Sequence, residues 1–360
     1  MKKECCSVKD GSRLNKVGGQ AVLEGVMMKA GNRTVTSCRK DDGSIAVYDD
    51  EFVSVRKKHK ILNLPILRGV VNFIEMMALS MKTLNASADA LGIEEEDGKF
   101  EKWCKKHLGA KATDVIMLVS LILGLGLSVL LFIFLPTLAA DGIDWLWQNV
   151  FHKSPLTSTT IAIIEGVLKI AIFIVYLLLV SLMKDIRRTF MYHGAEHKTI
   201  ACFEAGEELT PENAMKHKRF HPRCGTSFMF LMIGIGIVVG MCIRNFMPTN
   251  TPSLIISAIK LALLPLTMGV GYEILMVAGK HDNFLTRIIS APGLWVQRIT
   301  TKEPTLDMLE IAIVSTKCAL RDEFPEYMEF WSNKGWEKKE EKTEEESFEE
   351  TSDNNAETNE

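Results

Sequence analysis

Two histidines and a glutamate lie within five consecutive residues of this sequence, His193-Gly-Ala-Glu196-His197. Residues four apart on a helix share one face, with Cβ atoms about 5–6 Å apart. The imidazoles of His193 and His197 are therefore expected to bind one metal ion together. Glu196 falls on nearly the same side and could take a proton from a metal-bound water. The order His-x-x-Glu-His is that of the reversed zinc-peptidase motif.

A catalytic zinc ion needs a third protein ligand, and the candidates lie further along the chain. His221 and Cys224 belong to the segment HPRCG, whose proline and glycine predict a loop that folds back on the helix. Glu204 shares the face of the two histidines, but it lies seven residues on, about 10 Å along the axis. It is too far to share the ion unless the helix breaks. Two acidic residues at the end of a later apolar run are further candidates: Glu273 and Asp282.

The number of ligands decides what kind of site this is. A site with His193, His197, His221 and Cys224 all bound is closed and structural, whereas three ligands leave a position for water, so that hydrolysis becomes feasible. Both alternatives stay open. In a third alternative there is no metal, and the histidines are polar residues at a membrane surface beside basic residues that meet anionic lipid. Four of the eight histidines of the chain fall between His193 and His221, and this density favours a metal site.

Four apolar runs are long enough to cross a bilayer as helices, which takes about 20 residues. They are residues 115–140, 161–183, 228–247 and 254–278. The second run carries Glu165 and Lys169, spaced so that they can pair on one face. The fourth carries Lys260. A charge at mid-bilayer costs roughly 2.5–3.5 kcal/mol, so these side chains are expected near an interface or facing the bundle.

Basic residues predict the orientation of these spans. The loop 184–227 between the second and third runs carries eight lysines and arginines, whereas residues 141–160 carry only Lys153. Positively charged loops stay in the cytoplasm. The sequence therefore predicts a multi-pass protein of the cell membrane, with the histidine-rich loop and both termini cytoplasmic.

The first 60 residues are predicted to form a small β-rich cytoplasmic segment. Runs at 33–37, 44–48 and 51–55 are rich in strand-forming residues and are separated by Asp-Gly and Asp-Asp turn signals. The glycine pair at 18–19 predicts a turn. Segment 61–110 is predicted to hold an amphipathic helix from Pro65 to about residue 91, lying on the membrane or against the bundle. Its polar residues fall near one face and are expected to meet water or the site: Arg68, Asn72, Glu75 and Lys82.

The remaining segments complete a mainly α fold, a polytopic membrane helix bundle of about four spans in residues 111–283. Residues 284–335 are predicted to form a helical cytoplasmic segment. Residues 336–360 are rich in Glu, Lys, Ser, Thr and Asn, so they are predicted to be a disordered acidic tail. The eight cysteines contain no C-x-x-C pair, which argues against a disulfide framework.

Four segments resemble the YqhQ-like bacterial membrane proteins, a family described as predicted metal-dependent enzymes of unknown function. The segments are GGQAVLEGVMMK, YHGAEHKTIACFE, HPRCGTSF and APGLWVQRITTKEPTLDMLEIA. The resemblance spans roughly residues 18–320 and implies a polytopic membrane protein with a metal site of unsettled substrate. The residues that fall in its most characteristic segments are His193, Glu196, His197, His221 and Cys224, with Gln20 and Glu24 in the opening one.

The sequence therefore predicts a zinc-dependent membrane hydrolase, of which a peptidase is one form, acting at the cytoplasmic face. His193 and His197 would hold zinc with His221 or Cys224, and Glu196 would be the base. The alternative is a non-catalytic membrane scaffold or assembly factor with a structural zinc site. The expected partners are the lipid bilayer and an unknown substrate or protein.

Two other classes have less support. The basic residues lie beside the predicted membrane without interleaved aromatic residues, so no nucleic acid is expected as a partner. A transporter is disfavoured because the spans lack paired Gly/Pro-broken helices in matching positions, although Pro265 interrupts one of them.

Overall fold

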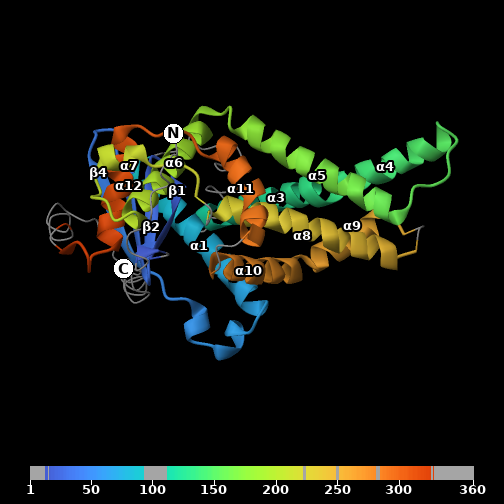
Figure 1. Ribbon diagram of the computed structural model, residues 1–360, viewed down its shortest axis with the longest axis horizontal. Helices are drawn as coiled ribbons and strands as arrows, with labels where there is room; N and C mark the ends of the chain where they lie inside the picture. Colours follow the sequence, from blue (N-terminus) through green and yellow to red (C-terminus); the bar gives the residue numbers. More distant parts are fainter. Residues whose placement is uncertain are drawn as a thin grey trace, which may run out of the picture.

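The computed structural model describes residues 13–92 apart from Asn15, then 112–221, 224–248, 251–280, 284–325 and Tyr327. The described chain is mainly helical and has one four-stranded sheet near its N-terminus. Figure 1 shows two regions, a bundle of long helices and a head in which helices pack on the sheet. The predicted tail at 336–360 lies outside the described residues, as do parts of segments 1–60, 61–110 and 284–335.

The sheet is an antiparallel meander in the order β1-β2-β3-β4. Its strands are β1 (Val17–Val22), β2 (Gly25–Ala30), β3 (Arg33–Arg39) and β4 (Ile45–Glu51). The predicted runs at 33–37 and 44–48 are confirmed by β3 and β4. Two-residue turns join β1 to β2 and β2 to β3, a connection typical of antiparallel hairpins.

Two predictions in this region are wrong. The run 51–55 is not a strand, because β4 ends at Glu51 and Ser54 caps a short 3-10 helix, with its hydroxyl donating to the carboxylate of Glu75. The glycine pair lies inside β1 rather than in a turn. Gly19 faces Met28 of β2, and a Cβ atom there would come within 2.5 Å of the Met27 carbonyl oxygen. The glycine is therefore a requirement of close packing.

Helices cover both faces of the sheet. On one face lie α6 (Lys184–Glu204) and α12 (Leu306–Ala319), side by side, with the short α7 (Pro211–Lys216) against them. On the other lies α1 (Leu67–Ala90). Successive side chains of β2 point to opposite faces of the sheet, as in any strand. Met28 packs into the core formed with α6 and α12, and Met27 into the core on the side of α1. Most of α12 is buried on all sides, so it forms the centre of the head.

The helix expected from Pro65 to about residue 91 is confirmed by α1, whose polar face meets water at Lys82, 59% exposed, but contacts other parts of the protein at Glu75 and Arg68. Glu75 is buried and accepts hydrogen bonds from Ser54 and the backbone N–H of Val55. Arg68 forms an ion pair with Glu273, far along the chain. The polar stripe of α1 therefore attaches this helix to the rest of the protein.

The bundle contains the apolar runs predicted from the sequence. Among the described residues, three helices are long and apolar enough to cross a membrane: Val119–Asn149, Ser158–Val180 and Phe228–Phe246. They belong to α3 (Ala112–Val129) with α4 (Leu135–Asn149), to α5 (Ser158–Val180) and to α8 (Gly225–Phe246). A π-helical turn, Leu130–Phe134, joins α3 to α4 just before Pro136, whose missing N–H breaks the regular hydrogen-bond ladder.

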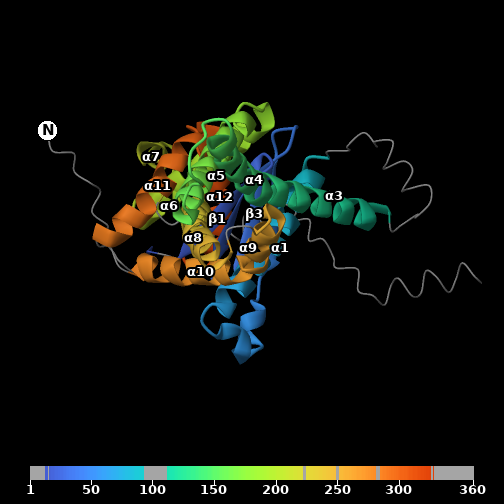
Figure 2. The ribbon, with the colours of Figure 1, turned by 90° about the vertical axis from the view of Figure 1, so that its right-hand side faces the viewer.

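The fourth run is divided. Helices α9 (Ser253–Ala262) and α10 (Leu264–Lys280) meet at a bend of 49°, so the part of the chain that the structure describes has up to four candidate spans. Pro265 follows the break and cannot donate the backbone hydrogen bond that would continue α9. Helix α11 (Phe284–Thr300) then leads back to the head. Figure 2 shows α4, α5, α8 and α9 gathered in front of the sheet.

Charged side chains inside the bundle form one buried cluster. Glu165 of α5 is 4% exposed and contacts Lys260 of α9, Arg244 of α8 at 3.2 Å and Lys169 at 3.9 Å. Arg244 also lies 2.8 Å from Asp141 of α4. The expectation that these charges face the bundle is confirmed. The carboxylates of Glu165 and Asp141 thus join four helices: α4, α5, α8 and α9.

We predict that Glu165→Ala destabilises the protein strongly, because Lys260 and Arg244 would stay buried without their shared carboxylate. Breaking such a buried pair costs about 3–5 kcal/mol. The measurement is the thermal unfolding midpoint of the purified full-length protein in detergent. Glu310→Ala is the matched control, since Glu310 is 53% exposed and pairs with Arg39 at the surface. An equal fall of the midpoint in both variants would contradict the account.

Candidate metal centre

Helix α6 carries the two histidines of the predicted motif with their rings together. The ring centroids of His193 and His197 are 4.4 Å apart. His193 is half-buried, and His197 is 1% exposed. Between them, Gly194 is needed because a Cβ atom there would lie 2.0 Å from the carbonyl oxygen of Lys302. The segment that follows α11 thus lies directly against the motif.

Backbone carbonyls fix the protonation of both rings. The Nδ1 atom of His193 lies 2.9 Å from the carbonyl oxygen of Thr300, and that of His197 lies 2.6 Å from the carbonyl oxygen of Arg219. A carbonyl oxygen only accepts, so each Nδ1 must carry the proton. In the neutral form of each ring, Nε2 is then left with a lone pair. Histidines that bind metal ions commonly donate the other ring N–H to a carbonyl or carboxylate in this way, which orients the ring.

Cys224 completes a group of three ligand atoms. Its Sγ lies 3.1 Å from Nε2 of His193. The ligand atoms of His193, His197 and Cys224 all lie within 4.8 Å of one another, and we call these residues the His–His–Cys group. Nε2 of His197 is buried and has no hydrogen-bond partner among the described residues. Two imidazole nitrogens and a thiol fit zinc, which would satisfy that nitrogen.

Burial also favours metal binding by His197. It lowers the pKa of this imidazole, although Cys224 and the Arg219 carbonyl act in the opposite direction. A ring with a lowered pKa is neutral over a wider pH range, and metal ions bind the neutral form.

Glu196 lies beside the His–His–Cys group without belonging to it. The side chain is 5% exposed, accepts a hydrogen bond from the backbone N–H of Gly19, and leaves Oε2 without a hydrogen-bond partner among the described residues. Burial raises the pKa of Glu196, and the nearby His193 and His221 offset this only in part. A Cβ atom on Gly19 would lie 3.2 Å from Cγ of Glu196. The glycine of β1 therefore makes room for this carboxylate.

His221 lies next to the His–His–Cys group but turns away from it. Its ring centroid is 5.6 Å from that of His197, and its Nε2 lies 3.6 Å from the carboxylate of Glu204. As the sequence predicted, Glu204 does not reach the group. The other two acidic candidates do not join it either: Glu273 pairs with Arg68, and Asp282 lies outside the described residues.

The loop that carries Cys224 is held by a residue the sequence analysis did not single out. Gln297 of α11 is 0% exposed and makes two hydrogen bonds of 2.8 Å with the backbone of His221, one to the N–H and one to the carbonyl. The side-chain amide of Gln297 thus satisfies both backbone groups of His221, as a paired strand would. The only sequence signal for Gln297 was its place in the APGLWVQRITTKEP segment.

A buried lysine ties the same loop to α6. Lys198 is 3% exposed, and its Nζ lies 2.5 Å from the carboxylate of Glu303, which also contacts Arg219 at 3.0 Å. Partial burial of Glu303 raises its pKa, but the hydrogen bonds from Lys198 and Arg219 outweigh this, and the pKa is lowered overall. The residue whose carbonyl orients His197 is therefore itself held in place.

Gln20 and Glu24, which the resemblance brought in, lie away from the His–His–Cys group. Gln20 hydrogen-bonds Thr83 and Ser80 of α1. Glu24 has φ of 46° in the turn between β1 and β2 and forms a double contact with the guanidinium of Arg188 on α6. Both side chains attach the sheet to helices, so they position the site rather than line it.

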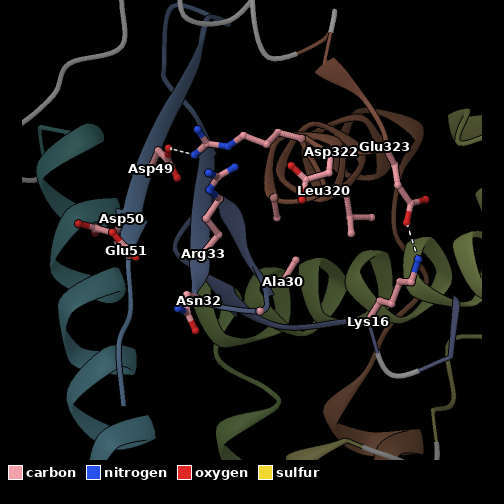
Figure 3. Close-up of a pocket in the computed structure, with 13 residues that line it drawn as sticks. Lys16, Ala30, Asn32, Arg33, Asp49, Asp50, Glu51, Leu320, Asp322 and Glu323 are labelled. Carbon is pink, nitrogen blue, oxygen red and sulfur yellow. Dashed lines mark hydrogen bonds and ion pairs between the residues drawn. The ribbon is translucent and has the colours of Figure 1, made fainter. Parts of the chain in front are cut away.

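A separate cleft of about 980 Å³ lies between the ends of the β-strands and the end of α12 (Figure 3). Its charged side chains contact one another, with Arg321 2.7 Å from Asp49 and Lys16 2.8 Å from Glu323. None of the predicted site residues lines it. The side chains of the predicted metal site therefore lie elsewhere.

Comparisons with known proteins agree with the resemblance. The family model described as "Protein of unknown function (DUF1385)" matches residues 64–322. The uncharacterized protein YqhQ of Bacillus subtilis (strain 168) is 36% identical over 311 residues, which cover 84% of this chain and 92% of that protein. No solved structure shows significant similarity to the chain.

We predict that Gln297→Leu weakens metal binding by about 10–100-fold, as loss of a supporting residue outside the ligand shell does. The variant keeps the size of the side chain but removes both hydrogen bonds to His221. The measurement is competition for zinc against a chelator. Gln148→Leu is the control, because Gln148 lies near the end of α4, where its side chain hydrogen-bonds Asp144 of the same helix. An unchanged zinc affinity of Gln297→Leu would show that the two hydrogen bonds from Gln297 to His221 do not support the site.

Proposed function

Because the chain belongs to the DUF1385 family, whose function is unknown, we propose from its own residues that it is a zinc-dependent membrane hydrolase. One observation carries this proposal. His193 and His197 each donate Nδ1–H to a backbone carbonyl, so both Nε2 atoms are available beside the thiol of Cys224. Such a preformed set of three ligands is typical of catalytic zinc sites, which keep a fourth position for water.

The position of His221 supports the open site over the closed one. Its Nε2 lies 3.6 Å from Glu204, and its backbone is held by Gln297. Turning the ring toward the ion would give up the contact with Glu204. We therefore assign His193, His197 and Cys224 as the ligands and leave His221 outside the set.

Glu196 is proposed to be the general base. It is buried beside the ligands, and burial raises its pKa, which makes it a stronger base than an ordinary glutamate. Zinc, when bound, would lower the pKa of its water and polarise the bond under attack. Glu196 would accept the proton of that water and pass it to the leaving group. The Gly19 N–H holds the carboxylate in place during this transfer.

The site is proposed to lie at the cytoplasmic face of the membrane. Cys224 immediately precedes α8, one of the helices long enough to span a bilayer, and α6 begins four residues after α5 ends. The many basic residues of the loop 184–227 favour the cytoplasm, and both termini would lie on that side. A substrate cleaved here would be a membrane protein or lipid reached near the headgroups, and a peptide bond is one candidate.

A non-catalytic scaffold or assembly factor is the second candidate, favoured by the closeness of His221 to His197. With ring centroids 5.6 Å apart, a rotation of His221 could add a fourth ligand and close the site. Zinc would then fix the loop against α6 without chemistry.

We predict that Glu196→Gln keeps its zinc but loses all hydrolysis, since Gln cannot accept the proton. Metal content is measured on the purified variant. Membrane proteomes and lipid extracts are compared between deletion cells carrying the unsubstituted protein and deletion cells carrying the variant. Products are expected only with the former. Glu212→Gln, at an exposed position on α7, is the control. Full product formation by Glu196→Gln would remove the hydrolase proposal.

We predict that His221→Ala leaves zinc content unchanged, whereas Cys224→Ala lowers it by one equivalent per chain. The reason is that only Cys224 belongs to the set of ligand atoms that lie together. Elemental analysis of the full-length proteins gives the answer. Equal losses in the two variants would instead support the closed site and the scaffold.

A further inference from the structure

A second set of ligating side chains lies at the other end of α6. The thiol of Cys202, the carboxylate of Glu207 and the imidazole of His217 have ligand atoms within 4.8 Å of one another. We call these three residues the turn site. None of them belongs to the His–His–Cys group, and the proposed hydrolase chemistry uses none of them.

The chain brings these residues together over a short distance. Helix α6 ends in a left-handed turn at Gly206, with φ of 74°, and the N–H of Glu207 bonds back to the carbonyl of Cys202 at 3.3 Å. The N–H of Gly206 bonds to the carbonyl of Phe203 at 3.0 Å. These two bonds form a Schellman motif, which places Glu207 over the last turn of the helix. Helix α7 ends at Lys216, and His217, which follows it, brings its ring to within 3.2 Å of the Glu207 carboxylate.

The turn site is separate from the His–His–Cys group. Cys202 lies five residues after His197, which on a helix is about 140° around the axis and about 7.5 Å along it. The thiol therefore points to another side of α6. There it lies in the core of the head, 0% exposed, while the His217 side chain is 9% exposed and that of Glu207 is 40% exposed.

We propose that the turn site binds a second divalent metal ion of the zinc class. A thiolate, an imidazole and a carboxylate are the three ligand types that zinc takes in proteins, and three of them leave one position for water. An ion could enter from the solvent past Glu207, whose carboxylate is partly exposed, and would be bound on its buried side by the thiolate of Cys202. This proposal goes beyond the hydrolase proposal and does not depend on it.

The contacts already present are compatible with an ion. Nε2 of His217 lies 3.2 Å from the carboxylate of Glu207, and Sγ of Cys202 lies 3.6 Å from the carbonyl oxygen of Glu208. An ion between the three side chains would replace the first contact with two bonds to itself. It would lock the end of α7 to the end of α6, four residues before His221.

Cobalt(II) substitution tests the proposal, because cobalt bound to a thiolate absorbs strongly in the near ultraviolet. The full-length protein is purified without metal, and cobalt is added to four forms. They are the unsubstituted protein, a His193→Ala/His197→Ala/Cys224→Ser variant, a Cys202→Ser/His217→Ala variant and the combination. We expect two equivalents in the first, one in each of the next two, and none in the last. The thiolate band should remain in both single-site variants.

The pattern of loss separates the two proposals. If the His–His–Cys group binds nothing, the unsubstituted protein takes up one equivalent, and the Cys202→Ser/His217→Ala variant takes up none. If the turn site binds nothing, the triple variant that lacks the His–His–Cys ligands shows no thiolate band, and our inference is overturned.

A milder variant guards against misfolding of the head. Glu207→Gln changes an exposed side chain, so the buried core is not disturbed. In the background without His193, His197 and Cys224 as ligands, it should weaken cobalt binding at least tenfold. Glu208→Gln is the matched control, since Glu208 is the next residue along the chain and its carboxylate does not belong to the turn site. Equal affinities of these two variants would also overturn the inference.

Discussion

The candidate metal centre depends on two hydrogen bonds from histidine rings to backbone carbonyls. The carbonyls of Thr300 and Arg219 hold the protons of His193 and His197 on Nδ1. Without them, either ring could rotate or change tautomer, and its Nε2 would no longer be directed at a common point. Since the two carbonyls come from different parts of the chain, the site can form only when α6, the loop before α8 and the end of α11 are packed together.

The packing of the head supplies that arrangement. Gly19 in β1 and Gly194 in α6 each allow a close approach that a Cβ atom would prevent, to Glu196 in one case and to the Lys302 carbonyl in the other. Glu303 then joins Lys198 to Arg219. Because the side chains of Glu196 and Lys198 are buried, water has little access to their side of these contacts. The head therefore acts as a rigid support for side chains that would otherwise lie on a flexible loop.

The helical spacing of residues made part of the site and of the bundle predictable from the sequence. The spacing of His193 and His197 places them on one helical face, and the length of the apolar runs predicts the bundle, which α3–α4, α5, α8 and the α9–α10 pair confirm. Cys224 lies against His193 of α6, as a loop folding back on the helix would place it, although Gly225 begins α8 and Pro222 lies outside the described residues. Each of these predictions rests on neighbouring residues alone.

The parts that were missed depend on tertiary contacts. A backbone carbonyl acceptor has no residue type, so no sequence pattern points to Thr300 or Arg219. The direction of His221 is set by Glu204 and by Gln297 of a distant helix. Gly19 was read as part of a turn, whereas the Met27 carbonyl and Met28 of β2, with Glu196 of α6 beyond them, leave no room for a Cβ atom there.

The most direct test of the account is the ligand shell of bound zinc. X-ray absorption at the zinc edge is measured on the full-length protein carrying Cys202→Ser and His217→Ala, so that only the His–His–Cys group can contribute. The account predicts one sulfur at about 2.3 Å and two imidazole nitrogens at about 2.0–2.1 Å, with one further light atom. A shell without sulfur, or with oxygen atoms alone, would contradict it.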